Sequence, residues 1–201
     1  MYPKAVAVFD PKDLAVGPWP AGKPRGITLH HSADRNLEHV VAFGIAEKVG
    51  YHFIIDRLGI AHQGASLEQR VNHAGKANWL GMSPNREHVA VCVLSWGRLQ
   101  KVGEEFQSWS TKQVPNDSVA ERGDNFDGKV AYWDEATEAQ EAALWELLVW
   151  LCRKFDIPPI NIVGHDEAAL PRGRKDDPGG VISLSMVNLR LRMLDSLPLK
   201  K

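Results

Sequence analysis

The run from His88 to Leu94 is almost entirely apolar and lacks the alternation of a half-exposed strand. Such a run is typical of a central strand that is covered on both faces. Strand patterns also occur at Ile27 to His31 and at Ile160 to Gly164, and Tyr51 to Gln63 has the pattern of a hairpin with a turn at Arg57-Leu58-Gly59. These segments predict a central mixed sheet.

Three amphipathic segments provide helices to flank that sheet. Asn36 can cap a helix that runs to about Val49, and Thr137 with Gln140 has the form of a capping box for a helix that ends before Pro158. A final helix is expected from about Ser183 to Leu197. With 201 residues, of which 44% are hydrophobic, the chain can fill one core, so we predict a single α/β domain.

Three irregular regions complete the expected organisation. Residues 1–25 contain five prolines and are expected to form an extended lead-in on the surface of a domain that spans residues 26–198. Residues 64–88 are predicted to form a long surface loop with at most one short helix. Residues 97–133 are polar, with scattered aromatics, and form either an insertion packed on the surface or a wall of a substrate groove.

The composition limits the classes of partner and location. A net charge of −1 gives no general attraction to nucleic acid, so a local site must recognise the partner. The N-terminus lacks the apolar segment of a signal peptide and no run of about 18 apolar residues is present, so we expect a soluble chain made in the cytoplasm, without membrane insertion, and a monomer. Cys92 and Cys152 are expected to be buried thiols, although one disulfide remains possible.

Two patches far apart in the sequence carry groups that bind metals. His165 follows an apolar strand, and a loop rich in glycine and proline then presents Asp176 and Asp177, which the residues alone leave equally eligible. Strand alternation makes His30 a better ligand than His31, because His30 shares its face with polar neighbours. Two histidines and one aspartate are a typical ligand set for catalytic Zn²⁺, whose fourth position holds water, and amide hydrolysis is the reaction such a site favours.

Four segments in order resemble the type 2 N-acetylmuramoyl-L-alanine amidases, a family that includes phage endolysins, bacterial wall amidases and peptidoglycan recognition proteins. They are residues 29–33, 49–55, 72–75 and 164–179, and the likeness extends from about residue 25 to 195. The resemblance implies a zinc amidase catalytic domain over residues 26–198, interrupted by the insertion at about 97–133, with the zinc site at strand ends.

The resemblance also assigns individual residues. It implies that His30, His165 and Asp177 bind Zn²⁺ and that Lys175 assists catalysis. The expected central strand has no glutamate, so Tyr51 takes the role of catalytic partner, as in a phage-type subset. The segment His73-Ala74-Gly75 matches a position near the substrate cleft and is expected to bind substrate. The insertion departs from compact phage members and leaves the specificity for the stem peptide open.

The function that follows is hydrolysis of the amide bond between N-acetylmuramic acid and L-alanine, with peptidoglycan or a muropeptide as partner. A phage or prophage endolysin that acts on the bacterial cell wall is the favoured role. A cytosolic amidase that recycles anhydro-muropeptides and a delivered antibacterial toxin are alternatives with the same chemistry. An alternative of another class is a peptidoglycan recognition domain that binds without cleaving, which all three retained ligands disfavour.

Overall fold

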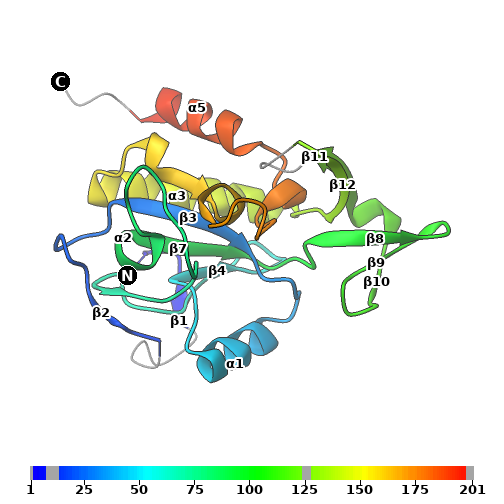
Figure 1. Ribbon diagram of the computed structural model, residues 1–201, viewed down its shortest axis with the longest axis horizontal. Helices are drawn as coiled ribbons and strands as arrows, with labels where there is room; N and C mark the ends of the chain where they lie inside the picture. The colour runs from blue at the N-terminus through cyan, green and yellow to red at the C-terminus, as the bar shows by residue number, and fades with distance from the viewer. Residues whose placement is uncertain (1, 8–13, 124–127, 198–201) are drawn as a thin grey trace.

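The computed structural model describes residues 2–7, 14–123 and 128–197. Its main sheet has six strands in the order β1-β5-β4-β7-β3-β13 (Figure 1). Strands β4, β7, β3 and β13 are parallel to their neighbours, whereas β5 runs antiparallel to β4. The predicted mixed sheet is therefore confirmed. The strands are β1 (Val6–Ala7), β3 (Gly26–His31), β4 (Phe53–Ile55), β5 (Ala61–Gln63), β7 (His88–Val93) and β13 (Ile162–Gly164).

Helices cover both faces of this sheet. Helices α3 (Glu138–Phe155) and α5 (Met186–Ser196) pack on one face, and α1 (Leu37–Glu47) packs on the other (Figure 1). Each residue of the central strand β7 is buried, as its apolar composition predicts. The last helix starts later than expected because the side chain of Ser185 caps it by accepting from the backbone N–H of Asn188. The fold class predicted from the sequence is confirmed.

The start of α3 is tied to the ends of two strands. The predicted capping box forms, since Thr137 accepts from the N–H of Gln140 and the side chain of Gln140 accepts from the N–H of Thr137. The buried amide of Gln140 then donates to the carbonyls of Ile55 and Leu94, at 3.1 and 2.9 Å. This glutamine therefore connects the helix to the carboxyl ends of β4 and β7.

Two predicted strands are shorter than expected. The hairpin between β4 and β5 forms with its turn at Asp56 to Gly59, but its first strand begins only at Phe53. The strand expected from Ile160 begins at Ile162, because Pro159–Asn161 forms a 3₁₀ turn (η2). Pro159 has no backbone N–H to donate to a neighbouring strand, which favours the turn.

The lead-in is extended but not confined to the surface. Strand β1 pairs with β5, and β2 (Gly17–Pro18) pairs with β6 (Gln69–Arg70). Tyr2 and Trp19 are buried in the main core, where the indole N–H of Trp19 donates to the carbonyl of Leu67 at 2.7 Å. The sequence missed this burial because isolated aromatics between prolines have no periodicity. Residues 8–13 lie outside the described part of the chain.

The region 97–133 forms a second sheet, which the sequence did not predict. Its antiparallel order is β10-β9-β8-β12-β11, and it extends to the right in Figure 1. Trp133 is fully buried, and its ring packs against Gly179 and Gly180, where a Cβ would overlap it. Phe126, one of the scattered aromatics, lies outside the described residues. The strands are β8 (Arg98–Val102), β9 (Glu105–Gln107), β10 (Gln113–Val114), β11 (Val119–Gly123) and β12 (Val130–Asp134), with a 3₁₀ turn η1 (Asn116–Ser118).

The remaining expectations concern the long loop and the cysteines. Residues 64–88 contain only β6 and the single turn of helix α2 (Pro84–Glu87), as predicted, although Ala74 within them is fully buried. Cys92 and Cys152 are both free and buried, so the possible disulfide is not formed. Among the described residues, none of the helices has the length and apolar character that crossing a bilayer requires.

Candidate metal centre and active site

The two predicted histidines and Asp177 meet at one edge of the main sheet. His30 is next to the last residue of β3, and His165 begins α4 (His165–Ala168) directly after β13. Since β3 and β13 are adjacent and parallel, their carboxyl ends lie side by side. Asp177 reaches the same point from the loop after α4, and one ligand atom from each of the three residues lies within 4.8 Å of the others.

His165 contacts two oxygen atoms through its two ring nitrogens. Its Nε2 lies 3.0 Å from the carbonyl oxygen of Ala74, and its Nδ1 lies 3.0 Å from Oδ2 of Asp177. A neutral imidazole carries a single ring proton, and both partners are acceptors. A neutral ring therefore provides a proton for only one of these two contacts.

His30 belongs to a longer chain of contacts. Its Nδ1 lies 2.7 Å from Oδ2 of Asp177, and its Nε2 lies 3.0 Å from Nδ1 of His73. His73 in turn places Nε2 at 3.1 Å from the carbonyl oxygen of Pro84. These three contacts need three protons, but two neutral rings carry only two, so one contact lacks a proton.

The protonation states of the cluster suit a metal ion. Burial lowers the pKa of His30 to about 4, so its ring is neutral at neutral pH. Burial raises the pKa of Asp177, but the neighbouring rings of His165 and His30 outweigh that effect and hold it well below its usual range. A cation held by His30, His165 and Asp177 would supply the positive charge that these contacts need. The donors present therefore fit a divalent metal of the zinc type.

Asp176 and His31, the other candidates, lie beside the cluster. The carboxylate of Asp176 is 47% exposed, and its Oδ1 is 3.9 Å from Nε2 of His31. Nδ1 of His31 accepts from the backbone N–H of Ala33 at 3.2 Å, which leaves the ring proton on Nε2. Neither side chain belongs to the metal-binding group of the described residues, which consists of His30, His165 and Asp177.

Tyr51 lies against the cluster from the segment before β4. Its ring centre is 5.2 Å from that of His30, and the residue packs against Cys92. Burial, with Cys92 and Asp177 nearby, raises the pKa of Tyr51 well above its usual value. The phenol is therefore protonated at neutral pH and can donate a hydrogen bond.

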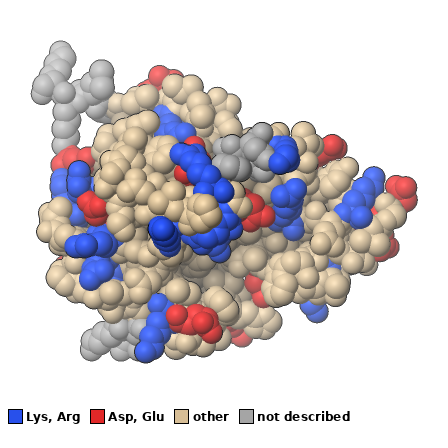
Figure 2. Space-filling model, viewed as in Figure 1, with Lys and Arg blue, Asp and Glu red and all other residues tan. Residues whose placement is uncertain are grey.

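The cluster opens into a cavity of about 910 Å³. Lys175 is exposed and lines this cavity, and Phe43 on α1 and Trp109 on the second sheet border it. Figure 2 shows Lys and Arg atoms gathered over the middle of this face, where Figure 1 draws the loop that follows α4. Arg172, Arg174 and Lys175 are the exposed cations of that loop. An anionic substrate would meet positive charge there.

The segment from His73 to Gly75 lines the same cavity and also supports the cluster. His73 and the carbonyl of Ala74 contact His30 and His165, as described above. Asn85 holds this segment, because its Oδ1 accepts the N–H groups of His73 and Ala74 at 2.8 Å each. The sequence did not single out Asn85, since nothing in its spacing links it to the ligands.

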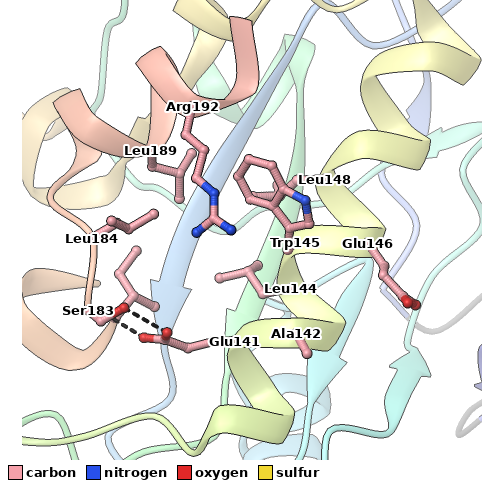
Figure 3. Close-up of a pocket in the computed structure, with 11 residues that line it drawn as sticks. Glu141, Ala142, Leu144, Trp145, Glu146, Leu148, Ser183, Leu184, Leu189 and Arg192 are labelled. Carbon is pink, nitrogen blue, oxygen red and sulfur yellow. Dashed lines mark hydrogen bonds between the residues drawn. The ribbon is translucent and has the colours of Figure 1, made fainter. Parts of the chain in front are cut away.

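A second cavity, of about 400 Å³, lies between α3 and α5 and shares no lining residue with the first. Figure 3 shows Arg192 extending from α5 toward Trp145 of α3, and its guanidinium lies 4.6 Å from the indole centre. Glu141 and Ser183 close the other end through hydrogen bonds. None of its lining residues belongs to the metal-binding cluster.

Comparison with solved structures supports the same fold. AmpDh3 from Pseudomonas aeruginosa, in complex with anhydromuramic pentapeptide, has a TM-score of 0.58 at 20% identity over 81% of this chain and 58% of its own. The Se-Met derivative of AmpD has a TM-score of 0.60 at 18% identity over 95% of each chain. The endolysin amidase LysCS from Clostridium intestinale URNW has a TM-score of 0.59 at 17% identity over 94% of this chain and 96% of its own.

Sequence comparison identifies the family. A search among curated proteins found no match. A family model described as N-acetylmuramoyl-L-alanine amidase, however, matches residues 20–180, a span that contains the whole cluster. The chain therefore belongs to the N-acetylmuramoyl-L-alanine amidase family, a family of hydrolases that cleave amide bonds.

Proposed function

We propose that this protein is a zinc-dependent amidase that hydrolyses the bond between the lactyl group of N-acetylmuramic acid and the L-alanine of the stem peptide in peptidoglycan. His30, His165 and Asp177 would hold the Zn²⁺. The observation that carries the proposal is the convergence of two imidazole nitrogens on Oδ2 of Asp177, at 2.7 and 3.0 Å. Bound zinc would polarise the amide carbonyl and lower the pKa of water.

Two further side chains have assigned roles. Tyr51 carries a protonated phenol against the cluster, so it can donate a hydrogen bond to the oxygen on which negative charge develops. Lys175 lines the cavity from the loop that also carries Asp177, and its ammonium is suited to the same developing charge. His73, Ala74 and Gly75, which also line the cavity, would bind substrate while they support the ligands.

The first experiment measures metal content and turnover together. Purified protein is loaded with zinc, dialysed, assayed for metal and incubated with wall sacculi, and the release of stem peptides is followed by mass spectrometry. We expect one zinc per chain and stem peptides with a free N-terminal alanine. Asp177→Ala should lose both the metal and the activity. A protein loaded with zinc that releases no stem peptide from any muropeptide would overturn the proposal.

The second experiment separates the side chains from the metal. Tyr51→Phe removes only the phenol proton donor, so zinc content should stay at one per chain while kcat falls roughly 100-fold. Lys175→Met keeps the length of the side chain and should behave in the same way. Equal kcat in the variants and in the wild type would remove Tyr51 or Lys175 from the mechanism.

We further propose that the substrate is the wall polymer, which is the role of an endolysin. The open cavity and the exposed cations around it support a large substrate, and LysCS, called an endolysin, has a similar fold. Rates on intact sacculi and on soluble anhydro-muropeptide with the same stem distinguish this role from recycling. Faster cleavage of the soluble compound would favour recycling, and muropeptide binding without turnover would favour a recognition domain.

A further inference from the structure

The loop between β9 and β10 presents a tryptophan at the rim of the active-site cavity. Ser108 is buried and closes the loop, because its N–H donates to the carbonyl of Lys112 and its carbonyl accepts from Thr111, both at 2.9 Å. Its hydroxyl accepts from the N–H of Lys112 at 3.1 Å. The tip that carries Trp109 is therefore held by several hydrogen bonds.

Trp109 is exposed but fixed in orientation. The side chain is 68% exposed, and the indole N–H donates to the carbonyl of Ala33 at 2.7 Å. That bond joins the second sheet to the segment that follows His30 at the end of β3. An exposed indole with its N–H satisfied keeps an apolar ring face available to a ligand and has little freedom left to lose on binding.

Trp109 is shared between two neighbouring cavities. One is the cavity of the metal cluster, and the other has about 520 Å³ and lies between the start of α1 and the loop that joins β9 to β10. Asp34 and His39 also line both. A ligand that extends from the cluster would therefore pass Trp109 and enter this second space, called here the outer cavity, which is lined by Asp34, Arg35, Asn36, His39, Trp96, Trp109, Ser110 and Lys112.

The outer cavity is suited to an uncharged polar ligand. Two indoles line it, Trp109 and the half-buried Trp96. Its charges are largely paired, because Arg35 forms an ion pair with the buried carboxylate of Asp134 and His39 lies 3.3 Å from a carboxylate oxygen of Asp34.

The charges of the outer cavity indicate which part of the proposed substrate, stem peptide or saccharide, it can bind. A stem peptide carries carboxylates, and among the residues that line the outer cavity only Lys112 offers a cation without an acidic partner in the part of the chain that the structure describes. A saccharide carries hydroxyl and acetamido groups, and the apolar face of a pyranose ring can lie flat on an indole. Saccharide therefore fits this cavity better than peptide.

We propose that Trp109 and the outer cavity bind the sugar that adjoins the cleaved muramyl residue, so that the enzyme favours glycan strands over a single muramyl peptide. The inference rests on the proposed amidase function. Trp109 is a substrate-binding residue that determines specificity, and the second sheet serves to place it beside the metal cluster.

The test compares two substrates with the same stem peptide, a muramyl tripeptide and a tetrasaccharide that carries the tripeptide. For Trp109→Ala, we expect kcat/KM on the tetrasaccharide to fall roughly tenfold, the equivalent of about 1.4 kcal/mol. The value for the muramyl tripeptide should stay within about twofold of wild type. Trp109→Phe keeps a ring face without the N–H and should lose less. Trp145→Ala, in the cavity between α3 and α5, is the matched control and should leave the ratio of the two values unchanged.

The other outcomes overturn the inference. An equal loss on both substrates would overturn it, because Trp109 would then have a purely structural role or contact the peptide that both substrates share. If the wild type cleaves neither substrate, the proposed function fails. Calorimetric titration with a tetramer of N-acetylglucosamine then tests the sugar-binding site without any need for catalysis. Binding that disappears in Trp109→Ala would support it, and no binding to wild type would overturn it.

Discussion

Nδ1 of His30 lies 2.7 Å from Oδ2 of Asp177. The neutral ring of His30 has one proton, and Nδ1 of His73, which contacts the other ring nitrogen of His30, competes with Asp177 for that proton. The contact with Asp177 is therefore short of positive charge unless a cation is supplied. Asp177 is therefore the group that would attract the metal, while its contacts with the two rings lower its pKa and so favour the folded protein at neutral pH.

Asp177→Asn should separate these two effects. The asparagine amide has two N–H donors, which can serve the two Nδ1 atoms that face this position. We expect the metal-free variant to melt near the temperature of the metal-free wild type, because the amide keeps contacts with both rings. Zinc at about 1,000 times its Kd should stabilise the wild type by about 4 kcal/mol and the variant hardly at all. Scanning calorimetry with and without zinc measures both, and a variant that gains as much from zinc as the wild type would contradict the ligand assignment.

His73→Ala removes the acceptor behind His30 without touching the metal cluster itself. Groups that orient metal-bound histidines typically contribute about 10- to 100-fold to metal affinity, so zinc affinity should fall by that factor. Competition with a chromophoric chelator measures it. His39→Ala, an exposed histidine at the same cavity, is the control and should retain wild-type affinity. Equal affinities in all three proteins would show that His73 does not orient His30.

His88 should make stability depend on pH. Burial, followed by the charge of Arg25, lowers its pKa from 6.5 to about 3, and its Nδ1 lies 2.9 Å from Oγ1 of Thr28. Between those values the unfolded chain binds a proton that the folded chain does not, so the free energy of unfolding rises with pH. The contribution is complete above pH 6.5 and is lost as the pH falls toward 3.

Urea unfolding of metal-free protein at several pH values checks this expectation. His88→Gln removes the titrating group, so the slope of unfolding free energy against pH should decrease by up to one proton over this range. His52, whose pKa burial also lowers to about 4, would supply part of the remaining slope. An unchanged slope in His88→Gln would contradict a buried neutral His88.

Gly97→Ala should be much more destabilising than Gly103→Ala. Both glycines have positive φ, 72° and 64°, so alanine is strained at either position, by roughly 1 to 2 kcal/mol. A Cβ at Gly97 would also overlap the ring of His31, whereas nothing lies within 4 Å at Gly103. We expect an additional cost of about 1 to 3 kcal/mol for Gly97→Ala, measured as the difference in unfolding free energy between the two variants. Equal costs would mean that His31 can move aside.

The sequence predicted the main sheet because its strands are buried on both faces. The apolar run at β7 and the helix signals at Asn36 and Thr137 each correspond to an element of the structure. The second sheet escaped prediction because its strands are mostly exposed, as β8 illustrates with a single buried residue, Leu99. Cross-strand pairing stabilises such strands, and a single sequence does not reveal which strands will pair.

The candidate site was also predicted only in part. Strand ends and a family resemblance were sufficient to propose His30, His165 and Asp177, and the structure brings their ligand atoms within 4.8 Å. No pattern in the sequence indicates the contact of His73 with the carbonyl of Pro84, because backbone carbonyls carry no residue-specific signal. The roles of all these residues in catalysis stay predictions.

The pairing of β1 with β5 has a consequence for how the chain can be shortened. Strand β1 lies at the margin of the main sheet, and Tyr2 just before it packs against Phe53 and Trp150. A chain trimmed to residue 20, where the family match begins, would leave β5 with unpaired backbone groups and an empty aromatic pocket beside them. An exposed edge strand of this kind can pair with strands of other molecules, so the trimmed chain should self-associate while its metal cluster stays intact.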